Sequence, residues 1–202
     1  MKRILYCLIL PLCVLSACTS VKNMTLAHDV TEEMIQPAFP EFVVEVGDEL
    51  NIIVSSLNEE AAAPFNKETN YIVGVNGAIK MPVLGEIDVG GKSVKQIKDE
   101  ITSLLADNLQ NVFVQIYFPK AAVTILGEVN TPQRISISKP ITILEAIGIA
   151  NGLTSNARYN EVEVLRTQAD KVVRYIVDLT SQSLFQSPCY YLTKGDVVNV
   201  RP

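Results

Sequence analysis

Apolar and polar residues alternate along the chain in a pattern that predicts short strands and two amphipathic helices. In residues 72–105, two short apolar runs flank Asn76 and Gly77. This dipeptide tolerates the positive φ values of a two-residue type I′ turn, so the segment predicts a β-hairpin. Ser93, followed three residues later by Gln96, has the spacing of a capping box and predicts that a helix begins near residue 94.

The predicted helix has one apolar side. Its apolar residues recur at steps of three and four, as expected for a helix that is buried along one face. Lysines and carboxylates fall elsewhere around the helix, where water can reach them. We therefore expect four residues of this helix to belong to the core: Val94, Ile97, Ile101 and Leu104.

Two segments, residues 42–54 and 191–200, share the order strand, Gly-Asp, strand. The glycine and aspartate are Gly47 and Asp48 in the first segment and Gly195 and Asp196 in the second. Aspartate beside glycine accepts hydrogen bonds from nearby backbone N–H groups, so we interpret both pairs as structural turns rather than catalytic carboxylates. Asparagine should preserve either turn, because its amide oxygen also accepts.

The remaining patterns predict further strands and a second helix. Residues 55–70 read as a polar connection with about one helical turn, and residues 112–118 alternate as a strand. Pro119 then marks the expected domain boundary. Further strands are expected at 122–129, 133–137, 161–166 and 172–178, with a helix from the Thr142 cap to Ala150. A hairpin, a helix across it and two more strands is the order of a β-grasp module, so the predicted class is α+β.

Composition and charge limit the function classes. The chain has 202 residues, 48% of them hydrophobic and 19% charged, which is enough for one or two small domains with a core. Residues 1–17 have the pattern of a signal peptide, because Lys2 and Arg3 precede an apolar run that is too short to span a bilayer. Without them the formal net charge changes from −5 to −7, and nothing indicates nucleic-acid binding.

Few residues are candidates for chemistry. His28, the single histidine, lies in residues 18–40, which we interpret as a polar tether. Cys189 lies among a proline and two tyrosines, and a buried structural role is favoured over a nucleophile. The carboxylates are scattered and lie beside turns. We therefore expect no enzyme, no metal site and no cofactor.

The residues before Cys18, Leu15-Ser16-Ala17, resemble the lipobox of bacterial lipoproteins. The resemblance implies cleavage before Cys18 and acylation of this cysteine with chains such as palmitate. Each buried methylene contributes about 0.8 kcal/mol, so two or three acyl chains hold a protein on a membrane without a transmembrane helix. The alternative is an ordinary signal peptide followed by a chance cysteine.

Three segments in this order resemble polysaccharide-export lipoproteins of the Wza type: residues 44–54, 75–101 and 123–153. The resemblance implies an export domain at 41–119 and an SLBB domain, β-grasp-like with a closing strand, at 120–202. It also implies a homo-oligomeric ring, lipid-anchored at the outer membrane with its folded part in the periplasm, that exports capsular or exopolysaccharide. The partner implied at the inner membrane is a polysaccharide co-polymerase, which often carries a tyrosine kinase.

Two features depart from the family pattern. The chain shows one SLBB module where enteric members have two, which implies a shorter stack of rings. It ends at Arg201 and Pro202, where family members commonly continue into an amphipathic helix that lines the pore. We therefore expect the chain as given to form a ring but no transmembrane pore by itself.

A second function is compatible with the same sequence. SLBB-type modules are also similar to domains that bind small soluble ligands, so a lipid-anchored, monomeric carbohydrate-binding protein is the alternative. Oligomeric state separates the two functions, because an exporter needs a closed ring while a capture protein does not.

Overall fold

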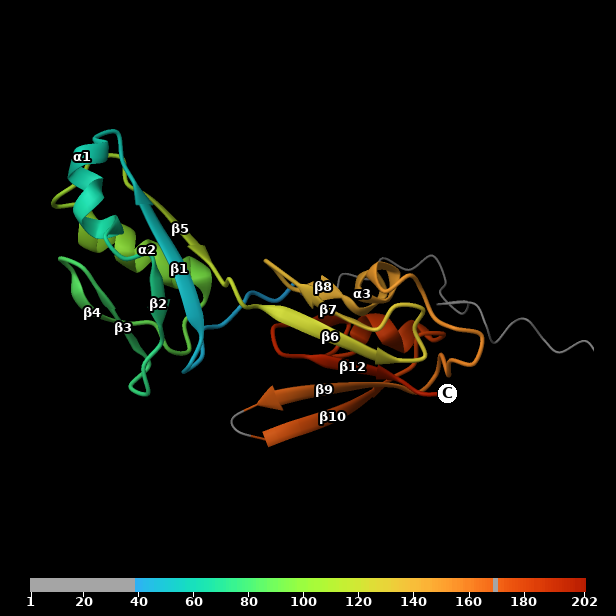
Figure 1. Cartoon of the computed structure of the whole chain (residues 1–202). Coiled ribbons are helices and arrows are strands. Elements are labelled where there is room, and N and C mark those ends of the chain that lie inside the picture. The colour runs from blue at the N-terminus through green and yellow to red at the C-terminus, as the bar shows by residue number, and fades with distance from the viewer. Residues whose placement is uncertain (1–38, 169–170) are drawn as a thin grey trace, which may run out of the picture.

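The computed structural model describes residues 39–168 and 171–202 of the chain (Figure 1). The expectations for the signal peptide, for Cys18 and for His28 lie outside the described residues. Within the described ranges the chain forms two groups of helices and strands, drawn on the left and on the right of Figure 1. The predicted α+β class is confirmed.

The first group is built on a three-stranded antiparallel sheet in the order β2-β1-β5. Its strands are β1 (Glu49–Ser55), β2 (Asn70–Ile72) and β5 (Phe113–Tyr117). Leu50, Ile52 and Val54 alternate along β1 and are buried, as their spacing predicted. The sheet therefore has one face in the core, and the side chains of its other face are exposed or half-buried.

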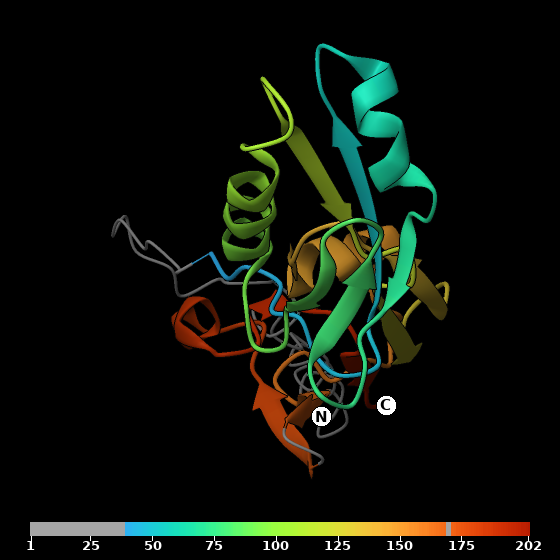
Figure 2. The same ribbon diagram turned by 90° about the vertical axis from the view of Figure 1, so that its left-hand side faces the viewer.

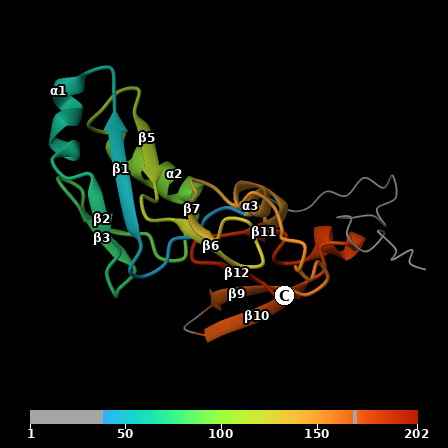
Figure 3. The same cartoon turned by 45° about the vertical axis from the view of Figure 1, so that its right-hand side comes forward.

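The remaining elements of the first group lie on the core face of this sheet (Figure 2). They are α1 (Glu59–Ala62), the 3-10 helix η2 (Ala63–Asn66), the hairpin of β3 (Ala78–Met81) with β4 (Gly85–Asp88), and α2 (Val94–Leu105). Ser93 and Gln96 form the predicted capping box at the start of α2. Figures 1 and 3 show no element over the opposite face of β1 and β5.

The second group is built on a five-stranded sheet in the order β10-β9-β12-β6-β7. Its strands are β6 (Ala122–Gly127), β7 (Gln133–Ser136), β9 (Val162–Gln168), β10 (Lys171–Val177) and β12 (Val197–Val200). β12 pairs with β6 in parallel, and the other pairs are antiparallel. At the end of this parallel pair Gly127 has φ +85°, and a Cβ there would lie 2.0 Å from the Val200 carbonyl oxygen. Only glycine fits so close an approach.

Shorter elements complete the second group. Helix α3 (Ile143–Ile149) begins at Thr142, whose side chain accepts from the Glu145 N–H, as the sequence predicted. A small antiparallel ladder joins β8 (Ile141–Thr142) to β11 (Tyr191–Leu192). The 3-10 helix η3 (Gln182–Gln186) precedes β11 in the chain. The hairpin, the helix and the central parallel pair of first and last strands give this group its β-grasp-like order.

The predicted two-residue hairpin at Asn76 and Gly77 needs correction. The turn closes locally, since the Gly77 N–H donates to the Gly74 carbonyl and the Gly74 N–H to the Ala78 carbonyl, both at 2.9 Å, but no ladder of β2 with β3 follows. These residues form a turn between β2 and β3, but β2 pairs with β1 and β3 pairs with β4. A type I′ turn needs positive φ at both central residues, and only Gly77 has it, at +76°. The physical reason is burial: Tyr71 and Val73 belong to the core, which directs β2 to the first sheet. The Gly77 carbonyl also accepts from the Val89 and Gly90 N–H groups.

Two other expectations also need correction. Residues 42–46 form no regular strand and make one isolated bridge, from Val43 to Ser93. Leu104 is 45% exposed, whereas Ile97, Ile101 and Leu105 are fully buried. At 3.6 residues per turn, Leu104 lies about 60° around the helix from Ile101 and falls at the border of the buried stripe. Val94 is half-buried against the core.

Candidate functional site

The first Gly-Asp turn is closed by its own aspartate. Gly47 has φ +86°, in the left-handed region that favours glycine. The Asp48 N–H donates to the Glu45 carbonyl at 3.1 Å, and the Glu45 N–H donates to Asp48 Oδ2 at 2.8 Å. The turn is held beside β2, because Gly47 donates to the Val73 carbonyl at 2.9 Å.

The second Gly-Asp turn has the same hydrogen bonds. Gly195 has φ +84°, the Asp196 N–H donates to the Thr193 carbonyl at 3.2 Å, and the Thr193 N–H donates to Asp196 Oδ2 at 2.8 Å. This turn is held beside β6, where Gly195 donates to the Ala122 carbonyl. The two segments that look alike in sequence thus have the same local geometry.

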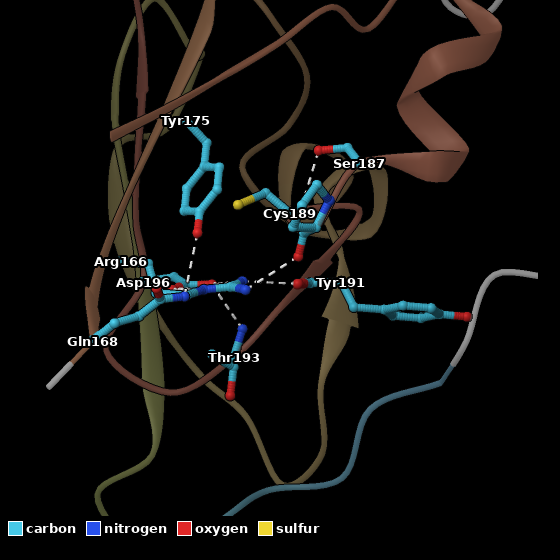
Figure 4. A network of polar contacts seen from close by, with 9 residues as sticks. Arg166, Gln168, Tyr175, Ser187, Cys189, Tyr191, Thr193 and Asp196 are labelled. Atoms are coloured by element: carbon cyan, nitrogen blue, oxygen red, sulfur yellow. Dashed lines mark hydrogen bonds and ion pairs between the residues drawn. The ribbon is translucent and has the colours of Figure 1, made fainter. Parts of the chain in front are cut away.

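Asp196 additionally forms a buried ion pair (Figure 4). Its side chain is fully buried, and Arg166 from β9 contacts both carboxylate oxygens, with Nε 2.9 Å from Oδ1 and Nη2 2.6 Å from Oδ2. Arg166 also donates to the carbonyls of Pro188 and Tyr191 at 3.1 and 3.0 Å. The hydrogen bonds from Arg166 to Asp196 raise the pKa of the guanidinium. One arginine therefore joins β9, the turn and the segment that enters β11.

Cys189 lies next to this ion pair and is completely buried. Burial raises the pKa of its thiol to about 11, so the sulfur is protonated at neutral pH and is a poor nucleophile. Its backbone N–H donates to Ser187 Oγ at 3.2 Å. This environment is that of a structural cysteine.

Lys194 connects the two Gly-Asp turns. Its Nζ lies 2.9 Å from Asp48 Oδ2 and 2.9 Å from Glu45 Oε2, although Lys194 belongs to the second turn and both acids to the first. The Phe118 ring centroid lies 5.8 Å from the same nitrogen, within the range of a cation–π contact. Only 11% of the Lys194 side chain is exposed. We refer to Glu45, Asp48, Phe118 and Lys194 as the clamp.

Sequence patterns indicated Asp48 and Asp196 but missed Lys194, Glu45 and Arg166. A signal was present for Lys194: it occupies the position before Gly-Asp where the first turn has Val46, and a charged residue at one of two matching turns is a difference worth testing. Nothing in the local pattern of β9 distinguishes Arg166, because its partner comes from a strand-turn segment far along the chain.

Hollows on the described surface include one of about 590 Å³ around the β2–β3 turn, lined by residues such as Tyr71, Asn76 and Glu86. Asn76 Nδ2 donates to Glu86 there, across the mouth of the β3–β4 hairpin. A hollow of about 250 Å³ borders the clamp, and one of about 360 Å³ lies beside Arg166 and Tyr191.

Residues 39–168 and 171–202 contain no cluster of three or more His, Cys, Asp or Glu side chains that could hold a metal ion. Within the same ranges, no helix has the length and apolar character to cross a membrane. The geometry at the two turns is that of structural ion pairs, since each aspartate carboxylate accepts one backbone N–H and pairs with one basic side chain.

Two family profiles match the chain in succession. The family described as polysaccharide biosynthesis/export protein matches residues 36–118, and the SLBB domain matches residues 121–200. Together the two matches cover both groups of elements. The family consists of export proteins rather than enzymes, in agreement with the sequence-based expectation.

Similar proteins have names that concern the export or production of polysaccharide. The EPS I polysaccharide export outer membrane protein EpsA of Ralstonia solanacearum is 28% identical over 137 residues, which cover 65% of this chain and 36% of that protein. The exopolysaccharide production protein ExoF of Rhizobium meliloti (strain 1021) is 27% identical over 92 residues, or 42% of this chain and 21% of that protein. The chain thus spans about a third or less of the relatives it matches. It belongs to the polysaccharide biosynthesis/export protein family, of the Wza type, with an SLBB domain following the export domain.

Proposed function

We propose that the chain is a component of a ring that exports capsular or exopolysaccharide and is anchored to the outer membrane with its folded part in the periplasm. The observation that carries this proposal is the succession of an export-family match and an SLBB match over residues 36–200. The names of two relatives, which concern polysaccharide export and the outer membrane, support it.

The proposal includes a division into domains at residues 41–119 and 120–202. Each proposed domain has its own sheet, and Pro119 lies between the two family matches. The clamp joins the proposed domains by ion pairs of 2.9 Å. A subunit of a closed ring needs a defined angle between its parts, and the clamp contributes to such an angle.

Attachment through acylated Cys18 is part of the same proposal and is motivated by the lipobox-like residues 15–18. Cys18→Ser should abolish acyl labelling and release the protein from the membrane fraction. Unchanged labelling and fractionation in this variant would contradict the anchor. The inner-membrane co-polymerase implied by the family resemblance is the expected partner.

Deletion of the gene in a strain that makes surface polysaccharide tests the export function. We expect surface polysaccharide to fall and to return when the full-length gene is supplied. The mass of the acylated protein in mild detergent then reports the number of subunits. One oligomer of defined subunit number supports a ring, whereas a monomer that binds carbohydrate supports the alternative of a capture protein.

A further inference from the structure

The open face of the first sheet carries two exposed aromatic rings in a row. Phe113 and Tyr117 lie four residues apart on β5, so they point to the same side of the sheet, and they are 59% and 48% exposed. At a rise of roughly 3.3 Å per residue, about 13 Å separates their backbone positions. This distance is that of a few sugar units in an extended chain.

Amide side chains lie between the two rings and beside Tyr117, together with the half-buried Ile53. Gln115 lies between them on β5. Asn51 on β1 is opposite Tyr117, and Asn70 on β2 is opposite Asn51. Asn51 Nδ2 donates to Asn70 Oδ1 at 2.7 Å, which leaves the Asn51 oxygen and the Asn70 nitrogen available. Among the residues that the structure describes, neither the side-chain amide of Gln115 nor the Tyr117 hydroxyl has a hydrogen-bond partner. The face therefore offers donors and acceptors beside flat apolar rings.

This face is also free of unpaired charge. Its charged member is Glu49, which is held by Lys120 at 2.5 Å. The open face of the second sheet differs, because Glu163 there accepts from Arg174, Arg201 and Asn199. A row of rings and neutral amides suits an uncharged partner with both apolar and hydroxyl surfaces. Sugar rings have that chemistry: their C–H faces stack on aromatic rings, and their hydroxyls exchange hydrogen bonds with amides.

We propose that Asn51, Asn70, Phe113, Gln115 and Tyr117, here called the amide–aromatic face, are a contact surface for uncharged stretches of the carbohydrate. The proposal rests on the export function proposed above and adds where the chain touches its cargo. Because the face is a flat sheet surface rather than a closed pocket, it contacts a few sugar units at a time and releases them easily. Weak, sequence-tolerant contact suits a surface along which a polymer must move.

Titration of the ¹⁵N-labelled protein with maltohexaose and with cellohexaose tests the surface. We expect at least one of these neutral hexasaccharides to shift the side-chain amide signals of Asn51, Asn70 and Gln115. The double variant Phe113→Ala, Tyr117→Ala should weaken this binding at least tenfold. Because both rings are exposed, the variant should unfold at the same urea concentration as the wild type. Phe39→Ala removes a ring of similar exposure, 56%, away from the face and should leave binding unchanged.

The proposal is overturned if neither hexasaccharide shifts these signals, or if the double variant binds as the wild type does. Efficient disulfide formation between Gln115→Cys subunits in the assembled protein would also overturn it, because a second copy would then cover the face. In cells, the double variant should assemble normally but reduce surface polysaccharide several-fold. Normal export by this variant contradicts the amide–aromatic face alone, whereas an unchanged amount of polysaccharide in the gene deletion contradicts the export function itself.

Discussion

The two Gly-Asp turns have the same backbone hydrogen bonds but different surroundings. Asp196 is completely buried and binds Arg166 through both of its oxygens, while Asp48 is 18% exposed and shares Lys194 with the exposed Glu45. A buried ion pair becomes costly when one partner is lost, because the other charge stays in a medium of low dielectric. Loss of Asp48 leaves no unpaired charge, because Lys194 keeps Glu45 as its partner. Similar turns can therefore differ greatly in their effect on stability.

The largest expected effect is that of Asp196→Asn. The amide oxygen can still accept the Thr193 N–H, but Arg166, only 15% exposed, loses its counter-charge. We expect the free energy of unfolding to fall by about 3–5 kcal/mol, measured by urea denaturation. The expectation from turn chemistry alone, that asparagine is tolerated at either position, would then fail at Asp196.

A double variant sharpens this result. Arg166→Met together with Asp196→Asn removes both charges, and it should recover part of the stability lost in the single variant. If the single variant Asp196→Asn were as stable as the wild type, the buried pair would have no net role and the contrast between the turns would disappear.

The next effect depends on pH and concerns Cys189, beside the same ion pair. The pKa of its thiol is raised from 9.0 to about 11 in the folded protein. Below pH 9 the thiol is protonated in both states; as the pH rises from 9 towards 11, the unfolded state alone ionises, so stability falls. The free energy of unfolding of the wild type, relative to that of the Cys189→Ala variant, should fall by about 2–3 kcal/mol between these two pH values. A difference that stays constant with pH would contradict the burial of the thiol.

Asp48→Asn should have a smaller effect. The turn bond to the Glu45 N–H is kept, and Lys194 keeps Glu45 as its counter-charge, so we expect the free energy of unfolding to fall by about 1 kcal/mol or less. The wild-type value should also show more dependence on salt than the variant, because salt screens pairs near the surface. A loss as large as that of Asp196→Asn would show that Glu45 does not replace Asp48 as the partner of Lys194.

The smallest effect is expected at a turn that lacks glycine. In the β3–β4 hairpin, Val83 has φ +69°, and the Leu84 N–H donates to the Pro82 carbonyl at 2.8 Å, which closes a γ-turn. Val83→Gly should raise the free energy of unfolding by up to about 1 kcal/mol, since relief of strain is partly offset by chain entropy. Gly47→Ala, at a similar φ, should lower it. Both changes are measured by thermal unfolding.

Local patterns were sufficient where a few neighbouring residues determine the structure. The Ser93 capping box, the Thr142 cap and the alternation of Leu50, Ile52 and Val54 all have the predicted form. Prediction failed where burial by distant residues decided the outcome. The Asn76–Gly77 turn does not lead into a ladder of β2 with β3, because β2 is buried beside β1. Leu104 lies at the edge of the buried stripe of α2, and the spacing of apolar residues does not show where that edge lies.

The clamp could not be predicted for the same reason. Its charged residues come from two turns at opposite ends of the folded region, and only the packing of the two sheets brings Lys194 to Asp48. The repeated Gly-Asp pattern located both turns but contained no information about their proximity. The pairing of strands in the second sheet could not be predicted either, because β6 pairs in parallel with β12, which is distant in the sequence.

The central place of β12 also affects the order in which the molecule can fold. β12 is the last strand of the described chain, yet it lies between β9 and β6, with Val197 opposite Thr124 and Val200 against Gly127. A chain that emerges with its N-terminus first cannot complete this sheet until its last strand arrives, and pairing between such distant segments is intrinsically slow. The first sheet, by contrast, can close as soon as β5 is available. Lys194 lies three residues before β12, so its contact with Asp48 in the first turn can form only after nearly the whole described chain has been synthesised.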